Sequence, residues 1–284
     1  MKIGITAGFV NENTRWGTDH YKKLKEQGYD VVDFQLADTD APVYTMSDAE
    51  LRNITAREKK LVSEAGLEIY QAHGPWRYPP MDYTAEDRAE RMEKMKKSIY
   101  ITSLLECPNW IVHPLMPFGL EDAGTEAALK TWDINVEFMS ELVKTAKDCG
   151  VTICLENMPF LKFSVSRPED ILRMVKTVND DNFKICLDTG HVAVFNDLSV
   201  GDEVRRVGSE IRAFHVHDNK LSEDLHLWPF FGVIDWEDFG KSLRDIDYKL
   251  PVSLEANRPW KVSDPMLEHM SKTLNMLMRE ILEQ

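Results

Sequence analysis

The chain has 284 residues, of which 43% are hydrophobic, and it carries a formal net charge of −14 at pH 7. This length suits either two domains or one α/β barrel, so length alone does not decide the architecture. The acidic charge disfavours nucleic acid as the main partner, because the overall field repels phosphate groups, although a local basic groove would still permit it. No apolar stretch approaches the roughly 18 residues that a membrane-spanning helix needs, and the N-terminal segment lacks the pattern of a signal peptide. We therefore expect a cytoplasmic protein without a membrane partner.

Short β-like runs alternate with amphipathic stretches of helical length along the whole chain. The expected strands lie at 2–8, 30–36, 68–74, 109–114, 151–157, 183–191, 211–219 and 251–257. The expected helices include 47–65, 85–106, 124–149, 167–178, 235–247 and 263–283. Eight strand–helix pairs with mostly continuous apolar strands predict a (β/α)8 barrel, in which a parallel sheet is surrounded by helices. We expect one barrel domain over 1–284.

The ends of the expected helices carry suitable residues. Glycines lie where helices should end before the next strand, at Gly28, Gly66 and Gly150. Ser166 is the expected N-cap of the 167–178 helix, with Pro168 in its first turn. The 263–283 helix has Met and Leu at helical spacing, which fits a face packed on the barrel and also fits a homo-oligomer interface.

Cysteine spacing argues against a disulfide or a zinc knuckle. The chain has Cys107, Cys149, Cys154 and Cys186, with no CxxC pair among them. Two of the four lie in expected core strands, so we expect reduced thiols.

Four expected strands in the second half of the chain end in residues that bind metals. They supply Glu156, Asp188 followed by His191, His215 with His217, and Glu255. A carboxylate at the end of an apolar run is costly to bury unpaired, so its repetition implies a shared cation or a shared polar cleft. Carboxylates together with an imidazole suit a hard or borderline divalent ion such as Mn, Co, Mg or Zn.

Further candidate ligands follow other strands. His73 and His113 end the expected third and fourth strands, and Asp224 and His226 form a D-x-H pair after the seventh. In a parallel barrel these side chains would face one mouth, at the carboxyl ends of the strands. A lone histidine at a strand end is more often structural, but six strands ending this way are not expected by chance.

As a set, these motifs resemble the xylose-isomerase-like barrel superfamily, which includes sugar isomerases, ketose 3-epimerases, inosose dehydratases and type IV apurinic endonucleases. The resemblance covers the chain and is carried by LEN at 155–157, LDTGH at 187–191, HVHDN at 215–219, DLH at 224–226 and LEAN at 254–257. It implies a barrel fold, but it does not decide the reaction, because several chemistries share one ligand scaffold.

The resemblance also implies roles for individual residues. One divalent ion would be held by Glu156, Asp188, His215 and Glu255. His215 is preferred over His217 because it lies three residues before Asp218, although strand alternation sends both imidazoles in the same direction. The other candidates would complete a three-zinc cluster as in the endonucleases, or would contact substrate hydroxyls as in sugar-active members; these are His73, His113, His191, Asp224 and His226.

The loops favour a sugar over DNA. The 114–124 loop has two acids and no base, and the 220–234 loop is aromatic with Lys220 as its one basic residue. Aromatic walls with few charges suit the C–H faces of a sugar or glycoside better than a phosphate backbone. The expected substrate wall includes Trp76, Trp228 and Phe230.

We therefore expect a metal-dependent sugar isomerase or epimerase that acts on a ketose or related keto-sugar. Glu156 or Glu255 would remove a proton to give a metal-stabilised enediolate, and the other glutamate would return one. His191 would orient a substrate oxygen, and Arg258 would bind a distal oxygen or form a surface salt bridge. His20 is expected to be exposed or locally bonded.

Two alternatives stay open. The same proton abstraction could end in elimination, which would make the protein a lyase or dehydratase of a 3-keto-glycoside or inosose, including the C-glycoside-cleaving type. The other alternative is a type IV apurinic endonuclease with three zinc ions.

Overall fold

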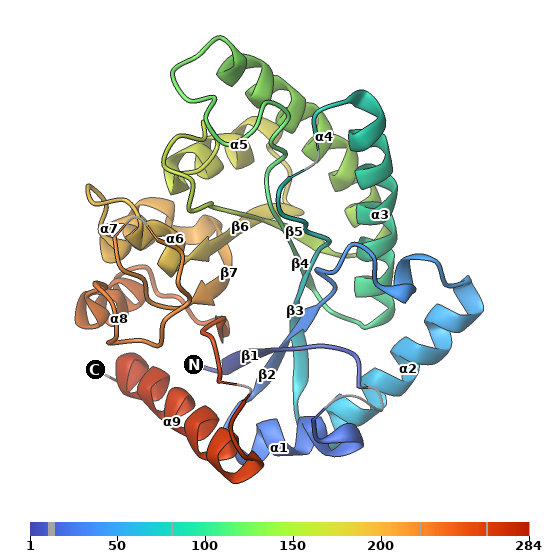
Figure 1. The fold of residues 1–284 in the computed structure, drawn as a ribbon, viewed down its shortest axis with the longest axis vertical. Coiled ribbons are helices and arrows are strands. Elements are labelled where there is room, and N and C mark those ends of the chain that lie inside the picture. Colours follow the sequence, from blue (N-terminus) through green and yellow to red (C-terminus); the bar gives the residue numbers. More distant parts are fainter. Residues whose placement is uncertain (11–14, 81, 222, 260, 284) are drawn as a thin grey trace.

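Eight parallel strands form a closed barrel in the computed structural model, which describes residues 1–10, 15–80, 82–221, 223–259 and 261–283. The strands follow one another in chain order around the barrel (Figure 1). The last strand pairs with the first and closes the sheet. They are β1 Ile3–Ala7, β2 Val31–Gln35, β3 Glu68–His73, β4 Asn109–Val112, β5 Thr152–Glu156, β6 Phe183–Asp188, β7 Ile211–Val216 and β8 Val252–Leu254. The predicted (β/α)8 barrel is thereby confirmed.

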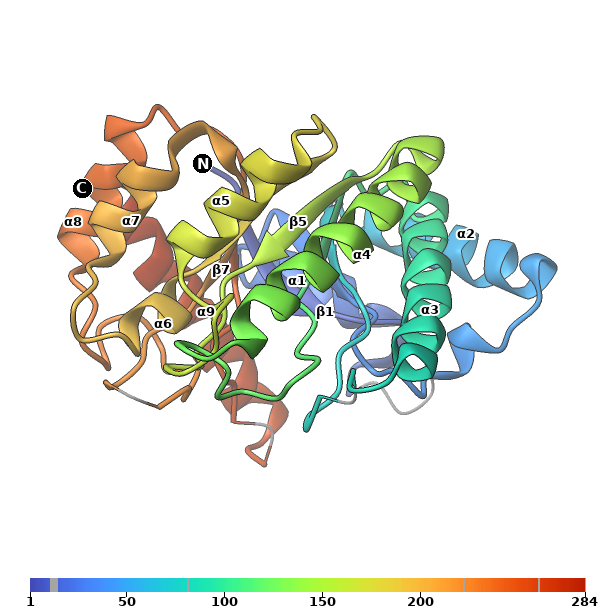
Figure 2. The ribbon, with the colours of Figure 1, turned by 90° about the horizontal axis from the view of Figure 1, so that it is seen from above.

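Helices surround the barrel on its outer side, as Figures 1 and 2 show. They are α1 His20–Glu26, α2 Asp48–Glu64, α3 Ala85–Leu104, α4 Ala127–Cys149, α5 Pro168–Val178, α6 Thr189–Ala193, α7 Val200–Val207, α8 Trp236–Asp245 and α9 Asp264–Glu283. Short 3-10 turns occur at η1 Gly17–Asp19, η2 Pro42–Tyr44 and η3 Gly208–Glu210. The sequence pattern located the longer helices within a few residues. It did not indicate α1, α6 and α7, because helices of 7, 5 and 8 residues are too short for a clear period.

Side-chain caps fix where several helices begin. Ser47 and Glu50 form a capping box at α2, and Thr84 and Asp87 form one at α3. The expected cap of α5 was wrong by one residue, since Arg167 occupies the N-cap position. Ser166 instead bonds within the loop after β5: its hydroxyl donates to the carbonyl of Met158 at 2.9 Å and accepts from the amide of Phe160 at 3.2 Å.

The cysteines and the last helix contribute to the packing of the barrel. All four cysteines are free, and three of them are buried. On α9, Leu274, Met278 and Ile281 are fully buried, whereas Met276 is exposed, so the apolar face of this helix packs on the barrel. Among the described residues, no helix is both long and apolar enough to cross a membrane.

Candidate metal centre

The predicted strand-end residues occupy one end of the barrel. His73, Glu156 and Asp188 are the last residues of β3, β5 and β6. His113 and Glu255 follow β4 and β8 directly, and His215 is the next-to-last residue of β7. Because the strands are parallel, their carboxyl ends meet at the same mouth.

Four of these side chains converge on one point, and we call them the central tetrad: Glu156, Asp188, His215 and Glu255. Each offers a ligand atom, and these atoms all lie within 4.8 Å of one another. The first three side chains are at most 1% exposed, and Glu255 is 20% exposed. Three carboxylates and one imidazole form a donor set that suits a divalent cation.

The two histidines of β7 face different partners. Nδ1 of His215 lies 2.8 Å from Oε1 of Glu156 and 3.3 Å from Oε2 of Glu255. Nε2 of His217 lies 3.0 Å from Oδ2 of Asp188, and its ring stacks on His226 at 4.0 Å. His215 therefore faces the two glutamates of the tetrad through Nδ1, whereas His217 contacts Asp188 from a neighbouring group of donors.

Two further donor groups flank the tetrad. One contains His73, His113 and Glu156, and the other contains His191, His217, Asp224 and His226. In the first group, Nε2 of His113 lies 3.0 Å from Oε2 of Glu156. In the second, Oδ2 of Asp224 lies 3.4 Å from Nε2 of His191 and 3.3 Å from Nε2 of His226. Every histidine and aspartate predicted at the mouth thus lies in one of these three groups.

The charge balance of the mouth fits a bound cation. Its acids are Glu156, Asp188, Asp224 and Glu255. Among the described residues, the ion-pair partners of these acids are all histidines, with no lysine or arginine. Buried carboxylates are costly unless a cation compensates them, and a divalent ion would supply that charge.

Burial and the neighbouring charges shift the pKa values of several groups at the mouth. Burial alone would raise the pKa of Glu156, but His215 and His113 hold it well below its usual range. Burial would lower the pKa of His191 and of His226; the nearby acids, Asp188 first for His191 and Asp224 for His226, raise them to about 10 and about 9. His113 is different, because burial lowers its pKa to about 4 despite the neighbouring Glu156.

A cavity of about 350 Å³ is lined by Glu156 and Glu255 of the tetrad and by most of the flanking residues, namely His73, His113, His191, Asp224 and His226. Its wall includes Trp76, whose ring meets that of His113 edge-on at 4.4 Å. Tyr78 and Phe160 add two more aromatic rings, stacked at 6.4 Å. The cavity therefore combines a polar floor with an aromatic side.

The comparisons with known proteins agree with this arrangement. Residues 21–279 match the sequence pattern of a family described as "Xylose isomerase-like TIM barrel". The chain belongs to this xylose isomerase-like family. It is 26% identical, over 264 residues, to a D-psicose 3-epimerase of Ruminiclostridium cellulolyticum, and the match covers 90% of this chain and 83% of the relative.

Solved structures of similar fold match this chain over nearly its whole length. A D-psicose 3-epimerase structure determined in the presence of D-fructose superposes with a TM-score of 0.78 at 21% identity, covering 100% of both chains. A D-psicose 3-epimerase from Clostridium cellulolyticum H10 with D-tagatose gives a TM-score of 0.77 at 19% identity, covering 99% of both chains. At these identities the likeness supports the fold.

Two residues predicted for the substrate wall, Trp228 and Phe230, lie outside the cavity over the tetrad. Nε1 of Trp228 donates to the carbonyl of Asn257 at 2.7 Å, and Phe230 is 49% exposed and packs near Trp236. Neither lines the cavity described above. The reason is Asp218, whose carboxylate accepts from the amides of Gly232, Val233 and Ile234 and folds this loop back on itself.

Other lining residues of the family site were not found from the sequence. They are Gln35, Ala37, Tyr78, Met158, Pro159 and Phe160. All follow or end strands, and Tyr78 and Phe160 stand in Pro-containing loops at the mouth, which is the signal that could have indicated them. Asp33, a carboxylate within the apolar run of β2, was also missed.

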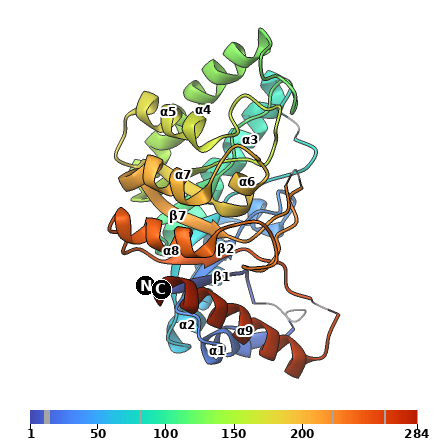
Figure 3. The same cartoon turned by 90° about the vertical axis from the view of Figure 1, so that its left-hand side faces the viewer.

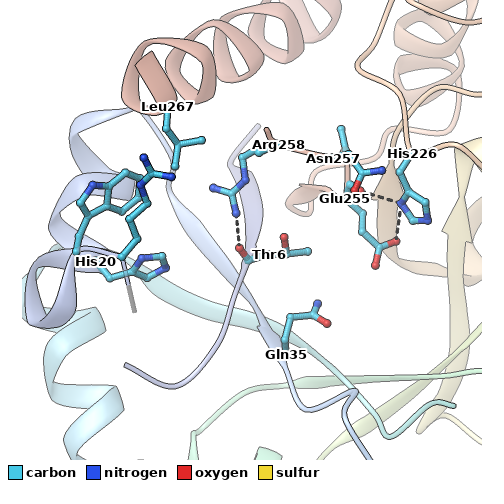
Figure 4. Close-up of a pocket in the computed structure, with 11 residues that line it drawn as sticks. Thr6, His20, Gln35, His226, Glu255, Asn257, Arg258 and Leu267 are labelled. Carbon is cyan, nitrogen blue, oxygen red and sulfur yellow. Dashed lines mark hydrogen bonds and ion pairs between the residues drawn. The ribbon is translucent and has the colours of Figure 1, made fainter. Parts of the chain in front are cut away.

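Arg258 and His20 line a second cavity of the family barrel (Figure 4). Arg258 donates to the carbonyl of Thr6 at 3.1 Å, and within the described chain it forms no ion pair. The salt bridge considered for it from the sequence is therefore absent there. His20 is half-buried and its ring stacks on the nearby Trp16, but its Nδ1 is buried and has no hydrogen-bond partner among the described residues.

Proposed function

We propose that this protein is a metal-dependent sugar epimerase or isomerase that acts on a ketose or a related keto-sugar. The convergence of Glu156, Asp188, His215 and Glu255, whose ligand atoms lie within 4.8 Å of one another, carries the proposal, because such a group could hold one cation between two glutamates. The match to a D-psicose 3-epimerase over 90% of the chain supports the same class of reaction. The donor set suits Mn, Co, Mg or Zn.

When bound, a divalent ion would act as a Lewis acid toward adjacent oxygens of the substrate. The two glutamates would then move the proton. Glu156 comes from β5 and Glu255 follows β8, so they reach the mouth from different sides of the barrel. One carboxylate takes the proton next to the substrate carbonyl, and the other returns a proton to the opposite face of the same carbon, which gives epimerisation. Return of the proton to the neighbouring carbon, with a proton shift between the oxygens, gives isomerisation.

The other residues of the cavity would hold the sugar. His73 and His191 lie beside the tetrad, with ring nitrogens 3.7 Å and 3.8 Å from oxygens of Glu156, where they can bond substrate hydroxyls. Trp76, Tyr78 and Phe160 give the apolar side on which the C–H faces of a sugar can pack. This division into polar floor and aromatic wall suits a small polyol.

A proton-exchange experiment tests the proposal. The protein would be treated with a chelator, reloaded with Mn, Co, Mg or Zn in parallel, and incubated with a panel of ketoses and keto-glycosides in deuterated water. We expect deuterium to enter the carbon next to the carbonyl only in metal-loaded samples. Absence of exchange with every metal and every substrate would overturn the proposal.

One observation favours a second candidate, a three-zinc apurinic endonuclease. The two flanking donor groups each offer a further set of ligands beside the tetrad. Elemental analysis separates the two, since about one ion per chain supports the sugar site and about three zinc ions support the endonuclease. Incision of abasic DNA at physiological salt is the matching activity assay.

A further inference from the structure

The second cavity has a volume of about 510 Å³ and lies beside the central tetrad, toward β1 and α1. Gln35, His226 and Glu255 line both this cavity and the one over the tetrad. Figure 4 shows Glu255 and His226 on one side of it and His20 on the other. A molecule whose reacting end is held near Glu255 can therefore extend into this second space.

Neighbouring elements hold the outer wall of this cavity in place. Helix α9 lies beside α1 in Figures 1 and 3, and Leu267 of α9 lines the cavity. Lys23 of α1 pairs with Glu268 of α9 at 3.2 Å, and the hydroxyl of Tyr29 donates to the carbonyl of Ser271 at 2.9 Å. These contacts tie α9 to the segment that carries His20.

Arg258 places a positive charge in this cavity, and the described residues offer it no acidic partner. Its guanidinium donates to the carbonyl of Thr6, and no carboxylate of the described residues pairs with it. Arg15, which also lines the cavity, is paired with Asp264 at 2.5 Å. Burial lowers the pKa of Arg258, which is the expected effect of removing a cation from water. The guanidinium still stays protonated, because its usual pKa lies above 12.

Two buried ring nitrogens of the same cavity are likewise unpaired within the described part of the chain. Nε1 of Trp16 and Nδ1 of His20 have no hydrogen-bond partner in the described part of the chain. The two rings stack at 5.7 Å with an angle of 28° between their planes. Burial, and then the charge of Arg258, lowers the pKa of His20 to about 4, so its ring is neutral at pH 7. An indole N–H can only donate, so the ligand that completes this site must offer acceptors.

We infer that the second cavity binds an oxyanion, a phosphate or a carboxylate, carried by the end of the keto-sugar that points away from Glu255. This substrate class rests on the epimerase function proposed above. A neutral hydroxyl could accept from Trp16, but it would leave the charge of Arg258 uncompensated. An oxyanion supplies several acceptors and the missing charge together, and a guanidinium binds such groups through paired N–H donors.

The first test measures binding of inorganic phosphate to the chelator-treated protein through its effect on thermal unfolding. We expect phosphate to raise Tm in the wild type and in Arg57→Gln, an exposed arginine of α2 that serves as the matched control. The rise should vanish in Arg258→Gln, persist in part in Arg258→Lys, and shrink in Trp16→Phe, which removes only the indole donor. Equal shifts in wild type and Arg258→Gln, or no shift in the wild type, would overturn the inference.

The second test compares three substrates on the metal-loaded enzyme: a neutral ketose, its terminal phosphate ester and its terminal carboxylate. We expect kcat/KM for one charged substrate to exceed that of the neutral ketose by roughly 10- to 100-fold, the range for a hydrogen bond to a charged group. The charged substrate with the higher kcat/KM shows whether the oxyanion is a phosphate or a carboxylate. In Arg258→Gln the ratio of kcat/KM for the charged substrate to that for the neutral ketose should fall toward one, whereas Arg57→Gln should keep the wild-type ratio.

The outcomes separate this inference from the proposed function. Proton exchange with neutral ketoses, without a preference for either charged substrate, would overturn the oxyanion site and leave the epimerase standing. Phosphate binding that depends on Arg258, with no proton exchange on any of the three substrates, would support the oxyanion site and count against the epimerase.

Discussion

Oδ2 of Asp33 accepts a hydrogen bond from Nε2–H of His215 at 3.0 Å, although the two residues are 182 positions apart. Asp33 lies in β2 with its side chain fully buried, and the same oxygen accepts from Nε2 of Gln71 at 2.9 Å. This contact fixes the proton of the His215 ring on Nε2. Nδ1 is then left to face Glu156 and Glu255, as a metal-binding imidazole oriented by a carboxylate would be.

Asp33→Asn should therefore weaken metal binding. The amide keeps the size of the side chain but lacks the charge that holds the His215 proton, and loss of such a partner lowers metal affinity by roughly 10- to 100-fold. Titration calorimetry with the metal-free protein measures the effect, with Asp245→Asn on the exposed end of α8 as the control. Unchanged affinity in Asp33→Asn would show that Asp33 does not orient the ligand.

Glu156→Gln and Glu255→Gln should each remove turnover while the barrel stays folded. A carboxylate that transfers a proton contributes roughly 100- to 10,000-fold to the rate, and a glutamine cannot accept the proton. The assay is deuterium exchange at saturating metal, with metal content and circular dichroism measured on the same samples. Glu64→Gln on the outer face of α2 is the control. A purely structural role of either glutamate predicts the opposite pattern, namely lost stability with normal exchange in the protein that remains folded.

The sequence indicated the barrel and the tetrad because both produce local patterns. Glu156 and Asp188 each end an apolar run, and the parallel barrel then brings the ends of distant strands together. The positions of loop side chains were harder to predict. Trp228 and Phe230 are aromatic residues of a loop at the mouth, and the sequence therefore suggested that they form the substrate wall. Their actual positions depend on hydrogen bonds from that loop to Asp218, which no local pattern encodes.

Long-range contacts account for the other differences between the sequence predictions and the structure. Asp33 bonds His215 across the barrel, and its role is visible only when both strands are in place. His20 lines its cavity together with Leu267 of α9, and Lys23 of α1 pairs with Glu268 of α9, so its surroundings depend on segments far apart in the chain. The same is true of Arg258, since its lack of an acidic partner within the described residues depends on every element around it.

Asp224→Asn distinguishes a substrate contact from a metal ligand. On the sugar proposal, the wild type binds about one ion per chain and the variant keeps it, because Asp224 lies outside the tetrad. We expect kcat/KM to fall by about tenfold through loss of a hydrogen bond within the cavity. Metal content comes from elemental analysis and activity from deuterium exchange. A metal content that fell from three ions to two would instead support the endonuclease candidate.

Gly190→Ala should disturb the histidines at the mouth through a steric clash. A Cβ at this position would lie 2.0 Å from Cε1 of His217, whereas one at Gly8 would meet its nearest atom at 3.8 Å. We expect a loss of about 1–3 kcal/mol in the free energy of unfolding, the usual range for overpacking. Urea denaturation measures it, and Gly8→Ala is the matched control. Equal stability of the two variants would mean that His217 moves aside without cost.

Glu58→Gln should change how stability depends on pH. Glu58 is buried on α2, where Oε2 accepts from the hydroxyl of Tyr21 at 2.9 Å and from the amide of Val10 at 3.1 Å. Burial raises the pKa of Glu58 above the 4.5 of an ordinary glutamate, so the folded protein holds this proton more tightly than the unfolded chain does. As pH rises from about 4.5 through the raised pKa, the unfolded chain ionises first and the folded state loses stability. The full cost is present above the folded pKa and absent below the unfolded one.

Glutamine can still accept both hydrogen bonds, but it has no charge to bury. The variant should therefore gain stability relative to the wild type as pH increases through this window, and the gain should level off at higher pH. Urea unfolding between pH 4 and pH 8 measures the difference, with Glu64→Gln, exposed on the same helix, as a control that should show no such slope. A stability difference that stays constant across the range would show that Glu58 is ionised with equal ease in the folded and unfolded chain.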